Sequence, residues 1–528
     1  MDTLALPMPG LGRASALLER IEAVADRAFG ERGNPWRHLG ALGFFCFWVC
    51  AASGIWIYVA FDTSAAGAFE SVAALDRNDW PLGAFARALH RYSADAMVLV
   101  VLTHLARELM RRHYAGFRRF AWITGVVLLI PLLFAGIGGY WLPWDQLGQW
   151  SLTATTEWFD AIPAFDGALT RNVIGEGQVN DRLFSLFIFL HIGVPLALLA
   201  LMWAHIQRVS PARTQPPRAL AAGLLAALSA LSLLVPLKLA APADLARLPA
   251  TLAVDWFYLA PHAAMALLTP AGLWVVAIGT LLLLAGLPFA TRVPRAPAAR
   301  VSLPDCNGCA RCFADCPFSA VTMVPRTDGR AHPRQASVDT DLCAGCGICT
   351  GACPSSTPFR RGETLRTGID MPQSPIGELR QALEARTARL AGHPRIVVFG
   401  CRWAADVQAL AGPDTAALTL LCAAMLPPSF VEYALRAGAD GVLVTGCREG
   451  DCEFRTGHAW VAARLDATRA PALRPSVPRE RVRLAWAARS DPGRLREALE
   501  RFREDLRQLP PGAARAGPPP KRQEISHG

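Results

Sequence analysis

Four histidines repeat one spacing inside two apolar segments of this 528-residue chain. His90 and His104 are 14 residues apart in AFARALHRYSADAMVLVVLTHLAREL, and His191 and His205 are 14 apart in LFSLFIFLHIGVPLALLALMWAHIQRV. Fourteen residues are close to four helical turns, so each pair lies on one helix face, about 21 Å apart along the axis. Two such helices packed antiparallel would form two layers of facing imidazoles, an arrangement that holds two stacked haems. The alternative, four unrelated histidines bonded to helix carbonyls, leaves the repeat unexplained.

Eight cysteines form two copies of a second pattern, CNGCARCFADCP at 306–317 and CAGCGICTGACP at 343–354. Each copy is the C-x2-C-x2-C-x3-C-P run of a two-cluster bacterial ferredoxin, in which the fourth cysteine ligates the other cluster. Zinc is the alternative, but zinc does not need eight cysteines in this pattern. We therefore predict two [4Fe–4S] clusters, one held by Cys306, Cys309, Cys312 and Cys353, the other by Cys343, Cys346, Cys349 and Cys316.

Four more cysteines lie near the C-terminus. The segments 395–401, 417–422 and 441–447 are typical of short buried strands, and 429–439 is typical of a helix between the last two. This alternation predicts a parallel sheet, closed by a further strand and a charged helix within 471–512. Three cysteines fall at the carboxyl ends of these strands, where such folds place their sites, and a fourth follows. The set Cys401, Cys422, Cys447 and Cys452 suits a [2Fe–2S] cluster; zinc or buried free cysteines are the alternatives.

The elements that position these residues are predicted from composition. Mean hydropathy is +0.26 and 52% of residues are hydrophobic, which indicates a membrane protein with soluble parts. The segment 11–29 is typical of an amphipathic helix that lies on the membrane, and no cleavable signal peptide is expected. The fold class is thus an all-α transmembrane haem-binding bundle, followed by a small α+β domain and an α/β parallel-sheet domain. Six apolar segments are long enough, or nearly so, to span a membrane: 36–60, 84–110, 120–140, 183–208, 219–240 and 265–289.

Loop charge predicts the orientation. Arginines cluster after the second, fourth and sixth spans, whereas the alternate loops are acidic. Both termini and the iron–sulfur domains are therefore expected on the cytoplasmic side of a bacterial-type inner membrane. Of 14 cysteines, 12 follow residue 305, in a compartment where disulfides are rare; Cys46 and Cys50 are expected to be packing residues. The net charge of +10 fits the loop pattern and needs no nucleic-acid partner.

Residues 20–210 resemble cytochrome b of the bc-type complexes, and GYWLPWDQLGQW (139–150) is similar to the photosynthetic form. Gly40, Gly54, Gly125 and Gly139 repeat the 14-residue interval, and a glycine lets a flat macrocycle approach the backbone closely. Simple helix packing is the alternative for these glycines. The resemblance implies two haems b, with Arg87 on a propionate. Because the second and fourth spans both begin outside, His90 would pair with His191 near the outer surface, and His104 with His205 near the cytoplasm.

The segment LPATLAVDWFYLAPH (248–262) resembles a degenerate form of that family's quinol-site Pro-Glu-Trp-Tyr motif. Asp255 stands where the family has glutamate, and a carboxylate there could exchange a proton with a quinone. The alternative is an interfacial loop with a Trp/Tyr belt and no quinone.

The C-terminal part resembles the delta subunit of methyl-viologen-reducing hydrogenase, a family also found fused to flavoproteins. The matching residues are Cys401 with Trp403, Cys422, and GADGVLVTGCREGDC at 438–452. Family members usually carry a further cysteine where this chain has Ala404, which leaves four thiols for one cluster.

These parts predict the domain order and the function. The expected segments are 1–35 (cytoplasmic amphipathic), 36–290 (cytochrome b-like), 291–300 (linker), 301–370 (ferredoxin-like), 393–510 (delta-subunit-like) and 511–528 (disordered tail). We expect an electron-transfer subunit of an oxidoreductase, in contact with membrane lipid, that links a cytoplasmic flavin-containing subunit to quinone. A homodimer through the cytochrome b-like part is also expected. The alternative is a redox-sensing membrane module that docks a partner without quinone turnover.

Overall fold

The computed structural model describes residues 11–173, 179–207, 212–247, 251–291, 294–360 and 365–510. These residues divide into two compact units, one that runs to Pro294 and one that begins at Arg295. The predicted tail 511–528, the first ten residues and part of the 291–300 linker lie outside the described residues.

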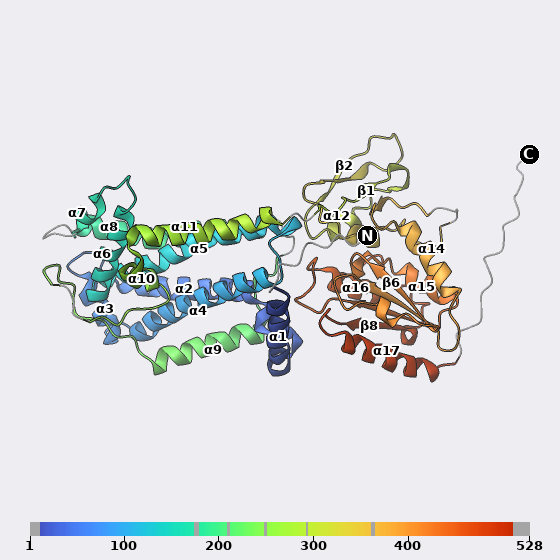
Figure 1. Cartoon of the computed structure of the whole chain (residues 1–528), viewed down its shortest axis with the longest axis horizontal. Helices are drawn as coiled ribbons and strands as arrows, with labels where there is room; N and C mark the ends of the chain where they lie inside the picture. Colours follow the sequence, from blue (N-terminus) through green and yellow to red (C-terminus); the bar gives the residue numbers. More distant parts are fainter. Residues whose placement is uncertain are drawn as a thin grey trace, which may run out of the picture. The chain divides into compact units, whose positions relative to one another are not determined.

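The first unit is helical (Figure 1). Its helices are α1 (Leu11–Gly33), α2 (Leu39–Ala60), α3 (Ala68–Asp76), α4 (Gly83–Met110), α5 (Arg119–Trp141), α6 (Gln146–Asp160), α7 (Ala168–Val173), α8 (Asp181–Ile206), α9 (Arg218–Leu234), α10 (Ala260–Leu268) and α11 (Pro270–Ala290). Within it, α2 packs along α4 and α5 packs along α8 (Figure 1). Residues buried among these helices, such as Cys46, Met97, Leu132 and Leu198, form their apolar core.

The prediction of six spans is only partly confirmed. Among the described residues, four helices are long and apolar enough to cross a membrane: α2, α5 with the turn that precedes it, α8 and α11. The fifth predicted span, α9, is apolar but has only 17 residues, whereas a span needs about 20. The second, α4, has 28 residues, but its arginines, acids and histidines lower its hydropathy. It packs against α2 and α9.

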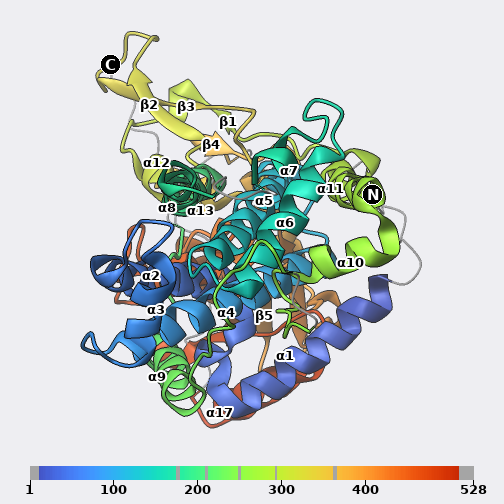
Figure 2. The same cartoon turned by 90° about the vertical axis from the view of Figure 1, so that its left-hand side faces the viewer.

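Helix α1 lies across one end of the bundle (Figures 1 and 2). Its buried face carries Leu18 and Glu22, and the Glu22 carboxylate accepts a hydrogen bond of 2.9 Å from Nε of Arg107 on α4 and pairs with Arg111. Leu17 and Val24 are 59% and 62% exposed on another face. The helix is amphipathic as predicted, but an ion pair also fastens it to α4.

The second unit begins with a small α+β region. The region has two antiparallel strand pairs, β1 with β4 and β2 with β3, and two short helices that each carry the third cysteine of a run and end before the fourth. The bounds are β1 (Arg300–Val301), α12 (Arg311–Asp315), β2 (Val321–Pro325), β3 (Arg334–Val338), α13 (Ile348–Ala352) and β4 (Ile369–Asp370), followed by α14 (Ile376–Thr387).

A four-stranded parallel sheet of order β6-β5-β7-β8 completes this unit, as the alternating pattern predicted. Ile396 and Val398 share a core with Leu499 and Phe502 of the C-terminal helix, because alternate strand residues face the same side of a sheet. The bounds are β5 (Ile396–Cys401), β6 (Thr415–Leu420), α15 (Ser429–Arg436), β7 (Gly441–Gly446), α16 (Gly457–Leu465), β8 (Val482–Trp486) and α17 (Pro492–Arg507).

Candidate functional site

The first histidine layer lies between α4 and α8. The ring centres of His90 and His191 are 6.1 Å apart. An iron held between two imidazoles by metal–nitrogen bonds of about 2 Å would place the ring centres on the order of 6 Å apart. A Cβ atom added at Gly54 or at Gly139 would lie 2.9 Å from the ring of His90 or His191, respectively. The glycines therefore leave room beside both rings.

The second layer, His104 and His205, repeats this arrangement 14 residues further along α4 and α8. A Cβ atom at Gly40 would lie 3.7 Å from the His104 ring, and one at Gly125 would lie 3.1 Å from the His205 ring. Each of the four glycines singled out by the 14-residue interval thus faces one of the four histidines. Helix packing alone would not require this one-to-one match, so the contacts favour a macrocycle cradle.

The orientation of α4 and α8 corrects one prediction. The helices run parallel, not antiparallel, because His90 and His191 are both the earlier histidine of their pair and face each other. The chain passes from α4 through α5 to α8, and two reversals of direction restore the original one. The pairing of His90 with His191 that follows from span order agrees with this geometry.

The Nδ1 atoms of three histidines have partners in the protein. The Nδ1 atom of His90 lies 2.8 Å from the carbonyl oxygen of Cys50, and that of His191 lies 3.0 Å from the carbonyl oxygen of Ala135. In His205 the partner is the Thr124 hydroxyl, at 2.9 Å. Metal-bound histidines commonly donate their second N–H in this way, which fixes the ring and leaves Nε2 for the metal. These partners were missed by sequence reasoning, because a carbonyl carries no sequence pattern.

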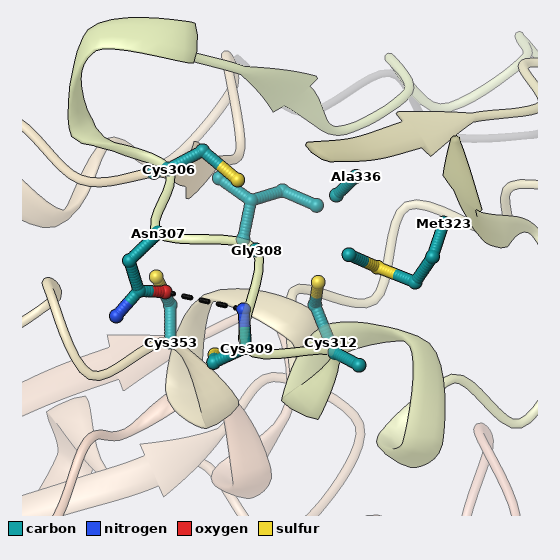
Figure 3. A pocket seen from close by; sticks show the side chains of 11 residues that line it. Cys306, Asn307, Gly308, Cys309, Cys312, Met323, Ala336 and Cys353 are labelled. Carbon is teal, nitrogen blue, oxygen red and sulfur yellow. Dashed lines mark hydrogen bonds between the residues drawn. The ribbon is translucent and has the colours of Figure 1, made fainter. Parts of the chain in front are cut away.

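The predicted ferredoxin ligands line two separate cavities. The first is lined by Cys306, Cys309, Cys312 and Cys353 (Figure 3), and Asn307 accepts a hydrogen bond from the Cys309 amide in the same loop. The second is lined by Cys343, Cys346, Cys349 and Cys316.

The fourth cysteine of each run thus lies in the cavity of the other run, as the spacing predicted. Burial raises the pKa of the Cys312 thiol to about 12 and that of Cys349 well above its ordinary value. Thiols in such surroundings ionise only with a cation beside them, which suits metal binding.

The four C-terminal cysteines are also brought together. Cys401 ends β5 and its Sγ atom lies 4.0 Å from that of Cys447, which follows β7. A Cβ atom at Gly457 would contact the sulfurs of both Cys422 and Cys452. All four thiols are buried.

The four sulfurs form one compact group, called here the C-terminal thiol ring: Cys401 and Cys447 are in sulfur–sulfur contact, and Cys422 and Cys452 both border Gly457. Hydrogen bonds from Cys422 and Cys447 lower the pKa of Cys401 to about 4, although burial opposes them. Neighbouring Cys422 and Cys447, and then His458 of α16, which sequence reasoning missed, hold the pKa of Cys452 well below its ordinary value.

Two predicted residues have partners within the chain. Asp255 pairs with Arg91 and accepts the backbone N–H groups of Phe257 and Tyr258, both at 2.8 Å. Arg87, expected on a propionate, donates to Asp76 at 2.5 Å. Asp255 therefore begins a turn and is tied to α4 next to His90.

Comparison with known proteins agrees with this geometry. Residues 26–211 match the family model described as cytochrome b/b6/petB. Cytochrome b6 of Chlamydomonas reinhardtii is 33% identical over 193 residues, which cover 35% of this chain and 88% of that protein. Cytochrome b6 of Tupiella akineta is 36% identical over 193 residues, with the same shares. The chain belongs to the cytochrome b/b6 family.

Two further family models match later parts of this cytochrome b. Residues 305–357 match a 4Fe-4S dicluster domain, and residues 396–510 match the methyl-viologen-reducing hydrogenase delta subunit. A solved structure titled "Hyperthermophilic respiratory Complex III" is similar with a TM-score of 0.41 and 23% identity, over 48% of this chain and 74% of that one. The protein is thus a multi-pass membrane cytochrome b fused to iron–sulfur domains.

Proposed function

We propose that this cytochrome b is the membrane electron-transfer subunit of an oxidoreductase, and that it links a cytoplasmic flavin-containing partner to quinone. The observation that carries the proposal is the presence, on one chain, of four glycine–histidine contacts in two layers and two four-cysteine cavities. These sites would hold two haems b and two [4Fe–4S] clusters, which exchange single electrons when bound.

The side chains of the bundle hold and orient the haem groups in this proposal. His90 and His191 would be the ligands of the outer haem, and His104 and His205 those of the cytoplasmic haem. The carbonyls of Cys50 and Ala135 fix the outer rings, which keeps both Nε2 atoms available.

The delta-subunit-like domain would be the docking end for the soluble partner. Its four buried thiols fit a [2Fe–2S] cluster, whose ligands must be close together and shielded from water. Trp403, two residues after Cys401, is 42% exposed and packs edge-on against Phe454 at 6.2 Å between ring centres. An exposed aromatic side chain next to a buried redox site suits a protein–protein contact. The matched family's name, a hydrogenase delta subunit, also supports a redox partner.

Quinone would react within the cytochrome b domain, which is in contact with lipid and forms a homodimer in this proposal. The outer site would include Asp255, which Arg91 joins to α4 directly after His90. A proton transfer from this carboxylate would require it to release Arg91.

A test uses the purified full chain in detergent and then in proteoliposomes. We expect two haems b by pyridine haemochrome assay and about ten non-haem irons, from clusters of four, four and two. Chemically reduced protein should be reoxidised by a quinone analogue, as followed by haem absorbance. Full cofactor content without reoxidation by any quinone analogue would instead support the redox-sensing module. A single haem or stoichiometric zinc would disprove the corresponding site.

A further inference from the structure

A buried arginine lies where the two iron–sulfur domains meet within the second unit. Arg464 of α16 has no exposed surface. Its guanidinium donates to the carbonyl oxygen of Ala424 at 2.7 Å and to that of Ile348 at 3.4 Å, and it pairs with the Asp315 carboxylate. One side chain therefore joins three segments that are far apart in sequence.

The acceptors share one property. Each lies one or two positions from a predicted cluster ligand, namely Cys422, Cys349 and Cys316. Two of these ligands belong to the [4Fe–4S] cavity of Cys343, Cys346, Cys349 and Cys316, and the third belongs to the C-terminal thiol ring. The other [4Fe–4S] cavity contributes no acceptor among the described contacts of Arg464.

Two glycines let the same segments approach closely. A Cβ atom at Gly351 would lie 2.0 Å from the Ala424 carbonyl oxygen, and one at Gly347 would lie 2.9 Å from the Met425 side chain. Met425 is fully buried in an apolar core that contains both Cys349 and Cys312, so it is the Gly347 and Gly351 contacts that point to one cysteine run. In contrast, Gly308 in the loop between Cys306 and Cys309 faces the Arg334 carbonyl oxygen of the small domain itself.

This contact contains a buried cation, the Arg464 guanidinium, paired with the Asp315 carboxylate. A guanidinium buried without a partner would be very unstable, and Asp315 supplies the counter-charge. Arg469 also pairs with Asp315, but its side chain is 26% exposed and its guanidinium lies over the Trp460 ring, 3.6 Å from its centre. A fixed positive charge next to a cluster stabilises the reduced form, which carries one more negative charge.

We infer that Arg464 is a positioning residue that sets the electron route through the second unit. It holds the Cys316/Cys343/Cys346/Cys349 cluster as the direct partner of the C-terminal cluster and favours its reduction. The Cys306/Cys309/Cys312/Cys353 cluster then comes next on the route. This inference rests on the proposed function, because it requires clusters at both sites.

The test compares Arg464→Gln with Arg464→Lys and with a matched control, Arg469→Gln, in the full chain. Arg469→Gln removes a positive charge that pairs with the same Asp315 carboxylate, but it leaves the Arg464 hydrogen bonds to Ile348 and Ala424 in place. Redox titrations followed by EPR give the midpoint potential of each cluster. Cys309→Ser, which alters only the other [4Fe–4S] cluster, assigns the signals.

Arg464→Gln should shift one [4Fe–4S] potential to a more negative value, that of the cluster unaffected by Cys309→Ser. Arg464→Lys keeps the positive charge and should bring the midpoint potential most of the way back to the wild-type value. Arg469→Gln should lower that potential much less than Arg464→Gln does. An equal shift of both [4Fe–4S] clusters, or an equal effect of Arg469→Gln, would overturn the inference.

A second measurement needs no Arg464 variant and uses Cys309→Ser only to assign the signals. In the wild-type protein, reduction of the cluster assigned to Cys316/Cys343/Cys346/Cys349 should speed the spin relaxation of the C-terminal cluster, because close paramagnets interact. If reduction of the other [4Fe–4S] cluster has the larger effect, the inferred order is wrong. Absence of any C-terminal cluster in wild-type protein would disprove the proposed function at that site and this inference with it, whereas intact clusters without the shift would disprove this inference alone.

Discussion

Gly54 of α2 and His90 of α4 face each other so closely that a Cβ atom on the glycine would lie 2.9 Å from Cε1 of the imidazole. The same relationship joins Gly139 of α5 to His191 of α8, so the layer of His90 and His191 is bordered by a glycine on either side. Each ring thus lies against the bare backbone of a glycine on a neighbouring helix. A larger residue in place of the glycine would fill the space beside the ring.

The first prediction concerns this space. Gly54→Val should reduce the haem content from two haems per chain to one, because the added side chain overlaps the His90 ring and overpacking costs about 1–3 kcal/mol. Gly193→Ala on α8 is the control, since a Cβ atom there has no neighbour within 4 Å. Haem content is measured by pyridine haemochrome assay. Two haems in a stable Gly54→Val protein would contradict the cradle.

The second prediction separates the two layers. His104→Ala should remove the cytoplasmic haem and leave the outer haem in place, because the two histidines of α4 are about 21 Å apart along the helix. Redox titration of the haem absorbance should then show one transition where the wild type shows two. Loss of both haems from a folded His104→Ala protein would argue against independent layers.

Sequence patterns predicted the ligands better than the residues that orient them. The 14-residue spacing of His90 from His104, and of His191 from His205, depends on local helix geometry, and the cysteine runs wrap a cluster through local loops, so both are visible in sequence. The Arg464–Asp315 pair joins residues 149 positions apart, and the Cys50 carbonyl that orients His90 is a backbone atom. Such tertiary contacts follow from packing and leave no periodic trace. The order of the spans, in contrast, already implies that α4 and α8 run parallel, and the antiparallel packing assumed from the histidine spacing alone was wrong.

The third prediction concerns the attachment of α1. Glu22→Gln would leave Arg107 and Arg111 of the first unit without their buried acid, and breaking one partner of a buried ion pair costs about 3–5 kcal/mol. We expect faster proteolytic cleavage within α1 in detergent or proteoliposomes. The control is Glu19→Gln, one turn earlier and only half-buried. Equal cleavage of the two variants would show that the ion pair does not hold the helix.

The fourth prediction concerns the C-terminal thiol ring. Cys447→Ser should abolish the [2Fe–2S] EPR signal, because Cys447 contacts Cys401 and its loss leaves three thiols. The two [4Fe–4S] signals serve as the internal control and should persist, as should haem reduction by dithionite. Reduction of the haems by the soluble partner should fall by at least about tenfold. Partner-driven reduction at the wild-type rate would show that electrons enter elsewhere.

The last prediction concerns the side of the membrane at which quinone reacts. Asp255 is the hypothetical proton-exchanging acid, and its pairing with Arg91 ties it to α4 beside the outer histidine layer. A site near His104 and His205 would instead take both electrons and protons from the cytoplasm, so turnover would be nearly electroneutral. At the outer site, electrons would move outward along the membrane potential, and each would gain about 2.3 kcal/mol per 100 mV on crossing the full membrane.

Asp255→Asn tests the two sites in proteoliposomes, with quinone reduction measured with and without an imposed potential. At the outer site, loss of the carboxylate should slow quinone reduction on the order of 100-fold, as for other acid–base groups, and the wild-type rate should depend on the potential. Asp244→Asn is the control, because Asp244 is an exposed acid in the same connection between α9 and α10. Full activity of Asp255→Asn, together with a wild-type rate that ignores the potential, would contradict the outer site. Quinone would then react near His104 and His205, where electrons arrive without crossing the membrane and the potential has no work to do.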